Sequence, residues 1–299
     1  MIYSIRQTTR YRYASIVPFA RHVLHLSPRT GPAQEVLQST ITIDPEPRER
    51  EATEDFFGNL VTHVAIEAPH RSLTLASESL VRAIERAAPE PDETPDWRVA
   101  AAMALDDPDL GPRSPAHFVF PSRLIPLAPS IRDYALRSFA ADRPILDGGI
   151  DLMERIKADF VYDPTATDVT TPTVMAFELR RGVCQDFAHL MIAGLRALGL
   201  PAAYVSGYLR TEPLPGHPRL EGADATHAWV SLWCGAEAGW QGLDPTNGVR
   251  TATDHIELAF GRDYADVSPV DGVIVASGRH TLSVAVDVTL HDRPSLPAI

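Results

Sequence analysis

An amphipathic helix that begins at a cysteine constrains the fold of this chain more than any other feature. Apolar side chains recur at helical spacing from Phe187 to Leu198, and Gly199 followed by Pro201 ends the pattern. Cys184 lies three residues before Phe187 and therefore on the same inward face. The positive end of a helix favours a thiolate, so the position suits a nucleophile. The alternative is a small buried hydrophobe, the more common role of a free cysteine on an apolar face.

A downstream stretch of alternating residues carries a partner for such a cysteine. Residues 225–234 alternate as a β-strand, with one face carrying His227, Trp229, Ser231 and Trp233 and the other Ala228, Val230, Leu232 and Cys234. Residues 235–239 predict a turn, and the next strand, 240–244, ends at Pro245.

Pairing Trp233 with Trp240 across that turn places the acidic residue of the second strand. The register puts Asp244 diagonal to His227 on the same face. Diagonal neighbours lie about 7–8 Å apart, a distance that a carboxylate and an imidazole can bridge. We therefore expect Asp244 to orient the His227 ring while the other ring nitrogen faces Cys184. This is the Cys-His-Asp arrangement of a thiol acyl-transfer enzyme.

Three motifs surround these residues: Gly182-Val183-Cys184-Gln185-Asp186-Phe187-Ala188, Thr226-His227-Ala228-Trp229 and Leu243-Asp244-Pro245-Thr246-Asn247. In this order they resemble the core of the transglutaminase-like superfamily, which consists of papain-like thiol enzymes. The run Asp159-Phe160-Val161-Tyr162-Asp163 and the amino-terminal third resemble the bacterial branch, in which a β-rich domain precedes the core. The resemblance implies that Cys184, His227 and Asp244 are catalytic. It leaves the reaction open, because relatives include cross-linkers, amidases, peptidases and members that have lost activity.

The chain divides into three predicted parts. Residues 1–90 form an antiparallel β-domain, with strands expected at 2–13, 36–43, 60–66 and 73–81 and a charged separator at 45–55. Residues 91–150 form a helical connecting region with helices near 97–105 and 131–141. Residues 151–299 form the catalytic core, closed by strands near 273–276 and 282–290. The expected fold class is α+β: an N-terminal antiparallel β-domain followed by a papain-like, transglutaminase-like core, whose nucleophile helix packs on an antiparallel sheet.

Charge and composition limit the partners of the protein. The net charge of −12, from 27 basic and 39 acidic residues, argues against nucleic acid and anionic membrane surfaces. No stretch has the apolar length of a signal peptide or a membrane span, so we expect a cytoplasmic protein. Two cysteines do not make a disulfide framework. We expect a peptide, protein or small amide as substrate, no cofactor and no metal; a homo-oligomer stays open.

The expected mechanism follows from the three central residues. His227 takes the thiol proton of Cys184, and the thiolate attacks an amide or ester carbonyl to form a thioester. Backbone N–H groups at the helix start would stabilise the oxyanion. Three residues are further candidates for oxyanion binding or for support of the site: Tyr162, Gln185 and Trp229. Water or an amine completes turnover, and the sequence does not choose between them. The segment 211–222 is expected to border the cleft.

Two other interpretations belong to different functional classes. A metal site could use Cys184, His189 and His227, although the paired ligand spacing of such sites is missing. His189, five residues after the cysteine, is expected to be structural. Alternatively, the fold could serve as a non-catalytic protein-binding module.

In the first 90 residues, His22, His25, His63 and His70 are scattered without the spacing of metal ligands.

Overall fold

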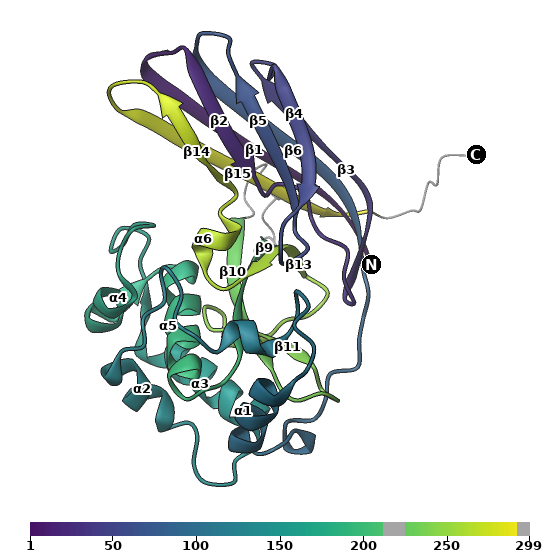
Figure 1. The fold of residues 1–299 in the computed structure, drawn as a ribbon, viewed down its shortest axis with the longest axis vertical. Helices are drawn as coiled ribbons and strands as arrows, with labels where there is room; N and C mark the ends of the chain where they lie inside the picture. Colours follow the sequence, from purple (N-terminus) through teal and green to yellow (C-terminus); the bar gives the residue numbers. More distant parts are fainter. Residues whose placement is uncertain (212–224, 292–299) are drawn as a thin grey trace, which may run out of the picture.

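Two antiparallel sheets packed against each other form one half of the molecule, and a sheet covered by helices forms the other (Figure 1). The computed structural model describes residues 1–211 and 225–291. The expected α+β class, an N-terminal β-domain joined to a papain-like core, is confirmed. The segment 212–222, most of the expected cleft border, lies outside the described residues.

The β-domain is a sandwich of two four-stranded sheets, ordered β15-β1-β6-β3 and β14-β2-β5-β4. Alternating side chains of both sheets meet in one core, which includes Leu73 and Leu75 from the first sheet and Leu24 and Val64 from the second. The strands are β1 (Ile2–Val17), β2 (Phe19–Leu24), β3 (Gln34–Asp44), β4 (Glu49–Glu54), β5 (Leu60–Ile66), β6 (His70–Ala83), β14 (Val270–Val275) and β15 (His280–Leu290).

One strand lies where the sequence predicted a separator. β4, Glu49–Glu54, falls within the charged patch at 45–55, so the prediction of a connecting segment there was wrong. All six of its residues are exposed, and it pairs only with β5 at the edge of its sheet. A charged edge strand protects a sheet from further pairing, but it has no apolar face that alternation could reveal.

The last two strands of the described residues pair with strands from the first third of the chain. β14 pairs with β2, and β15 pairs with β1 over eleven residue pairs, from Tyr3–Leu290 to Tyr13–His280. The sequence placed these closing strands in the 151–299 part without indicating their partners. Because an alternating pattern identifies a strand but not its neighbour, this pairing was not predictable. Residues 2–83 and 270–290 thus build one sandwich.

The second half is a five-stranded antiparallel sheet, ordered β12-β11-β10-β9-β13, with helices packed on it. Its strands are β9 (Ala202–Leu209), β10 (Ala225–Trp233), β11 (Trp240–Asp244), β12 (Val249–Arg250) and β13 (His255–Gly261). The helices are α1 (Trp97–Asp106), α2 (Pro129–Leu136), α3 (Ile145–Asp159), α4 (Thr173–Leu179), α5 (Cys184–Ala197) and α6 (Tyr264–Val267), with 3-10 turns η1 (Pro91–Glu93) and η2 (Pro115–Phe118). A short parallel pair joins β7 (Val161–Tyr162) to β8 (Arg181–Gly182). Within the described ranges, no helix is long and apolar enough to span a membrane.

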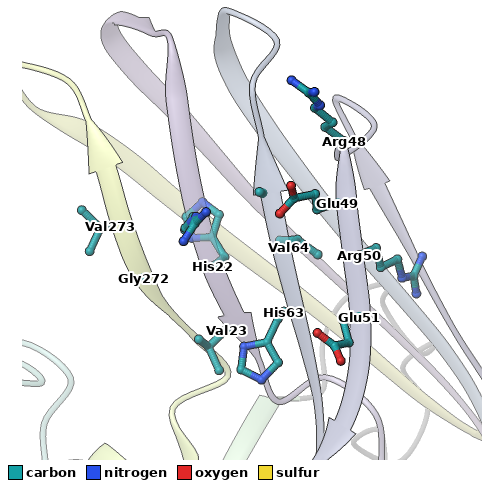
Figure 2. A pocket seen from close by; sticks show the side chains of 12 residues that line it. His22, Val23, Arg48, Glu49, Arg50, Glu51, His63, Val64, Gly272 and Val273 are labelled. Atoms are coloured by element: carbon teal, nitrogen blue, oxygen red, sulfur yellow. The ribbon is translucent and has the colours of Figure 1, made fainter.

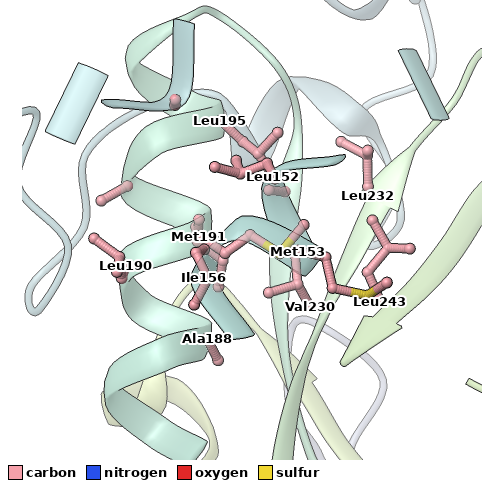
Figure 3. Close-up of a cluster of buried hydrophobic side chains, with 14 of the residues drawn as sticks. Leu152, Met153, Ile156, Ala188, Leu190, Met191, Leu195, Val230, Leu232 and Leu243 are labelled. Atoms are coloured by element: carbon pink, nitrogen blue, oxygen red, sulfur yellow. The ribbon is translucent and has the colours of Figure 1, made fainter. Parts of the chain in front are cut away.

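The apolar stripe of α5 is buried against the sheet (Figure 3). Met191 and Leu195 of α5 belong to the same core cluster as Val230 and Leu232 of β10. Helix α3 completes the cluster with Leu152, Met153 and Ile156, and β11 adds Leu243. The face of β10 that was predicted to be apolar therefore packs on α5, and His227 lies on the opposite face together with the buried Trp229.

A buried arginine connects the far end of α5 to its surroundings. Arg196 is only 2% exposed, and its guanidinium donates to the carbonyls of Ala202, Phe120 and Arg262 and to the Ser122 hydroxyl, at 2.7–3.1 Å. Burial lowers the pKa of Arg196 to about 10. Four acceptors from three segments hold the helix in place and so position Cys184 at its other end.

Two side-chain amides of the β-domain pair with the edge strand of the other half. Gln34 exchanges two hydrogen bonds with the backbone of Glu257, at 2.7 and 2.8 Å. Asn59 does the same with Phe260, at 2.8 Å each. Each side-chain amide takes the place of a neighbouring strand, because it bonds both the N–H and the C=O of one residue on the outer edge of β13.

Candidate active site

The N-terminus of α5 holds Cys184 in a half-buried position. The entering chain is fixed by Asp186, whose Oδ2 accepts hydrogen bonds from the Val183 N–H at 2.8 Å and from the Thr167 hydroxyl at 2.7 Å. Gly182 leaves room for this carboxylate, because a Cβ there would lie 2.5 Å from the same oxygen. The sulfur thus sits on a rigid helix start.

The predicted register of the next two strands is confirmed. Trp233 pairs with Trp240, and Val230 pairs with Leu243. One residue further along, Asp244 ends β11 on the face that His227 occupies on β10. Both side chains are almost fully buried, with 8% of His227 and none of Asp244 exposed.

Cys184, His227 and Asp244 lie together. The Nε2 atom of His227 is 2.7 Å from Oδ2 of Asp244, and Cys184 interacts with the same imidazole closely enough to raise its pKa. Since Nε2 is turned to the carboxylate, Nδ1 is the nitrogen available to the sulfur. The backbone N–H groups of Thr246 and Asn247 donate to the other oxygen, Oδ1, at 2.9 and 3.2 Å. The turn after β11 therefore fixes the plane of the carboxylate.

Burial and hydrogen bonding have opposite effects on the imidazole. Burial lowers the pKa of His227, but the hydrogen bonds to Asp244 and Cys184 outweigh burial and raise it to about 9. For Asp244, burial opposes ionisation, while hydrogen bonds from His227 and His255 hold its pKa far below the ordinary value. At neutral pH the site therefore contains an imidazolium between a carboxylate and a sulfur, which is the state in which a cysteine attacks carbonyl groups.

The three further candidates occupy different positions around this centre. Tyr162 lies on β7 and is 54% exposed. Its partial burial raises its pKa, and the electrostatic effect of Cys184 raises it further. Its ring therefore lies at the open side of the site. Gln185 is half-buried, and its Nε2 donates to the Val169 carbonyl at 3.4 Å. Trp229 is buried beneath the site, 6.1 Å from the His227 ring centroid.

His189 contacts Tyr264 and Tyr204. It is 3% exposed, its Nε2 accepts the Tyr264 N–H at 3.2 Å, and its ring lies 5.1 Å from that of Tyr204. Burial lowers the pKa of His189 to about 4, so the residue is a neutral hydrogen-bond acceptor at physiological pH. Its contacts explain it as part of the packing between α5 and α6.

One group of described residues brings three possible metal-ligand atoms within 4.8 Å of one another: His227, Asp244 and His255. It differs from Cys184, His189 and His227, the alternative metal site considered from the sequence. The nitrogens of both histidines already face Oδ2 of Asp244, at 2.7 and 3.3 Å. Hydrogen bonding among the three side chains therefore accounts for their closeness.

Two contributors to the site were not found from the sequence. Asn247 donates from Nδ2 to Asp244 Oδ2 at 2.7 Å, and His255 Nε2 lies 3.3 Å from the same oxygen. Asn247 belongs to the motif around Asp244, but the sequence pattern alone indicates no role for it. His255 could have been noticed in the sequence because it follows an acidic residue, Asp254, and begins the alternating run 255–261, which forms β13.

A separate hollow of about 750 Å³ lies on the β-domain (Figure 2). Its lining includes Glu49 and Glu51 of β4, His63 of β5 and Val273 of β14. None of its lining residues belongs to α5, β10 or β11. The outer face of one sandwich sheet thus carries a charged depression that is distinct from the site around Cys184.

Comparison with protein-family models matches two parts of the chain. Residues 3–82 match the bacterial transglutaminase-like N-terminal region, and residues 134–245 match the transglutaminase-like superfamily. The second match contains Cys184, His227 and Asp244, and the first covers nearly all of strands β1 to β6.

One relative and one solved structure match nearly the whole chain, and a second relative matches about half of it. An uncharacterised protein of Mycobacterium tuberculosis is 37% identical over 307 residues, covering 99% of this chain and 95% of its own length. A protein-glutamine gamma-glutamyltransferase of Pseudomonas aeruginosa is 30% identical over 172 residues, which are 56% of this chain and 25% of that protein. The crystal structure of a candidate cysteine protease from Cytophaga hutchinsonii superimposes with a TM-score of 0.75 at 20% identity, covering 99% of this chain and 93% of that one. That structure shows the same fold.

Proposed function

The chain belongs to the transglutaminase-like superfamily, and on that premise we propose that it is a thiol acyl-transfer enzyme that acts on amides through a thioester. The observation that carries this proposal is the grouping of Cys184, His227 and Asp244, with 2.7 Å between the imidazole and the carboxylate and with Cys184 acting on the same imidazole. We propose a peptide, protein or small molecule with a carboxamide as substrate. The similarity to a glutamine gamma-glutamyltransferase supports the side-chain amide of glutamine as the first substrate to test.

Each residue has a distinct role in this reaction. The Cys184 thiolate attacks the amide carbon, and the carbonyl oxygen becomes an oxyanion. N–H groups at the start of α5 stabilise this oxyanion, since a helix N-terminus favours negative charge. The tetrahedral intermediate collapses when its C–N bond breaks, the departing nitrogen takes the proton from His227, and an amine leaves.

The second half-reaction reverses the role of the histidine. His227, now neutral, takes a proton from water or from an incoming amine, which attacks the thioester carbon. The C–S bond breaks and Cys184 leaves as a thiolate, while Asp244 keeps the imidazole in the orientation needed for both steps. Water gives a carboxylic acid, and a primary amine gives a new amide. Tyr162, at the open side of the site, is our candidate for contact with the substrate carbonyl.

Alkylation and turnover test the proposal together. We expect iodoacetamide at pH 6–7 to modify Cys184 rapidly, because the imidazolium stabilises its thiolate, and the rate should fall at least tenfold in His227→Ala. Turnover is measured as ammonia release from a glutamine-containing peptide, with and without a primary amine. Cys184→Ala should abolish it while leaving the thermal midpoint nearly unchanged.

Cys234→Ala is the matched control. Cys234 is fully buried against α5, and burial raises its pKa, so we expect it to react slowly and to be dispensable for turnover. Equal, slow labelling of both cysteines would favour a non-catalytic binding module on the same fold. Full turnover in Cys184→Ala would reject the mechanism.

A further inference from the structure

The carboxylate of Asp244 has more partners than a single imidazole requires. Its Oδ1 accepts two backbone N–H groups, and its Oδ2 faces three side-chain nitrogens: His227 Nε2 and Asn247 Nδ2 at 2.7 Å and His255 Nε2 at 3.3 Å. His227 and the backbone groups suffice to position the carboxylate. A second histidine on the same oxygen needs its own explanation, because burying an ionisable side chain is costly.

The surroundings of His255 indicate that its ring is charged. The side chain is only 3% exposed, and its Nδ1 lies 2.9 Å from Oδ1 of Asp254 while its Nε2 faces Asp244. An imidazole donates from both nitrogens only when it is protonated. The N–H of Ala252 also approaches Nδ1, at 3.4 Å, but the carboxylate is closer.

The protein holds this ring in one orientation. His255 begins β13, opposite Leu209 of β9, and the indole of Trp229 meets it nearly perpendicularly with the ring centroids 5.3 Å apart. The centroid of His227 is 6.2 Å away. The groups that determine the charge of His255 are therefore Asp254 on its own segment, Asp244 on β11 and His227 on β10. The backbone N–H of Arg210, after β9, is bonded to the Asp254 carbonyl at 3.1 Å.

We propose that His255 is a positioning residue of this site: held as an imidazolium between Asp244 and Asp254, it shares the charge of Asp244 and so limits how tightly His227 retains its proton. This inference rests on the proposed function. General acid–base catalysis requires that His227 both give up a proton and take one back. A carboxylate that interacted with His227 alone would stabilise the imidazolium more strongly and so slow the transfer of its proton to the departing nitrogen.

Burial and hydrogen bonding also compete at His255. Burial lowers the pKa of His255, but hydrogen bonds to Asp244 and Asp254 outweigh it and raise the pKa. Removing this positive charge should have two effects of the same sign on His227, because Asp244 becomes less compensated and a like charge disappears. The His227 titration midpoint should therefore rise.

The test is the titration of His227 in the whole protein, measured by NMR of ring-labelled histidine. His255→Gln retains an amide donor without the charge, and His255→Phe retains a planar ring without either. We expect the His227 midpoint to rise by about one pH unit in both variants, and by less in Asp254→Asn. The matched control is His280→Gln, on the exposed part of β15, which should leave the midpoint unchanged.

The outcomes separate a positioning role from a purely structural one. If His255 only filled space or donated a hydrogen bond, the midpoint in His255→Gln would stay at its wild-type value, and that result would overturn the inference. Should His255→Phe fail to fold, His255→Gln and Asp254→Asn still decide. Slow alkylation of Cys184 in the wild-type protein would instead count against the proposed function. Rapid wild-type alkylation with an unmoved His227 midpoint in His255→Gln would reject only the inference.

Discussion

At the scale of single residues, the proposed chemistry depends on the protonation of one imidazole. His227 is buried, which disfavours its charge, yet its contacts to Asp244 and Cys184 raise its pKa to about 9. The carboxylate can exert this effect because it is itself fully desolvated and fixed by backbone N–H groups. The sequence placed these three residues in the right order and on the right faces, since alternation and strand register are local properties.

We predict that Asp244→Asn lowers turnover by a factor on the order of 10³–10⁴, because the imidazole loses both orientation and charge stabilisation. The His227 proton should also be lost at lower pH. The basic limb of the pH–rate profile, expected near pH 9 in the wild-type protein, should therefore shift downward. Asp92→Asn, at an exposed position in η1, is the control. A basic limb that stays in place would show that Asp244 does not govern the imidazole.

At the scale of elements, the close approach of strands β9 and β10 positions the indole of Trp229 beneath the site. Gly207 of β9 lies opposite His227, and a Cβ on it would be 2.3 Å from both the Trp229 ring and the Ile256 carbonyl. Glycine therefore leaves room for the indole beside the rings of His227 and His255. The sequence showed a glycine inside a strand, but the reason for it exists only once three strands are assembled.

We predict that Gly207→Ala lowers the free energy of unfolding by about 1–3 kcal/mol, as overpacking of a rigid core usually does. Displacement of Trp229 should also slow Cys184 alkylation by disturbing the His227 ring. Denaturant unfolding and iodoacetamide kinetics measure the two effects. Gly31→Ala is the control, because a Cβ on Gly31 would meet nothing within 4 Å. Equal stability of the two variants would contradict the close approach.

At the scale of the whole molecule, the two halves are joined by side chains that imitate a strand. Asn59 is completely buried and pairs with the backbone of Phe260, and Gln34 pairs with Glu257 three residues earlier on the same strand. Because β13 also carries His255, the β-domain supports the strand that brings the second histidine to Asp244. The N-terminal β-domain is therefore hydrogen-bonded to a strand that carries a residue of the site.

We predict that Asn59→Ala destabilises the protein by about 1–3 kcal/mol, since it leaves a buried N–H and a buried carbonyl of Phe260 without partners. Thermal or denaturant unfolding measures the loss. Gln38→Ala, at an exposed position of β3, should change stability by less than about 0.5 kcal/mol. If Asn59→Ala were as stable as this control, the side-chain pairing would have no role in joining the halves.

What the sequence determined by itself is the part of the protein governed by short-range periodicity. The helix from Cys184, the alternation around His227 and the Trp233–Trp240 register follow from spacing of 3.6 or 2 residues and from one turn, and they place Cys184, His227 and Asp244. Only the tertiary structure decided which strands are neighbours. It moved β14 and β15 to the first sheets, set Asn59 against β13, and brought His255 to Asp244. These contacts join segments distant along the chain, and no local pattern encodes a partner that lies tens or hundreds of residues away.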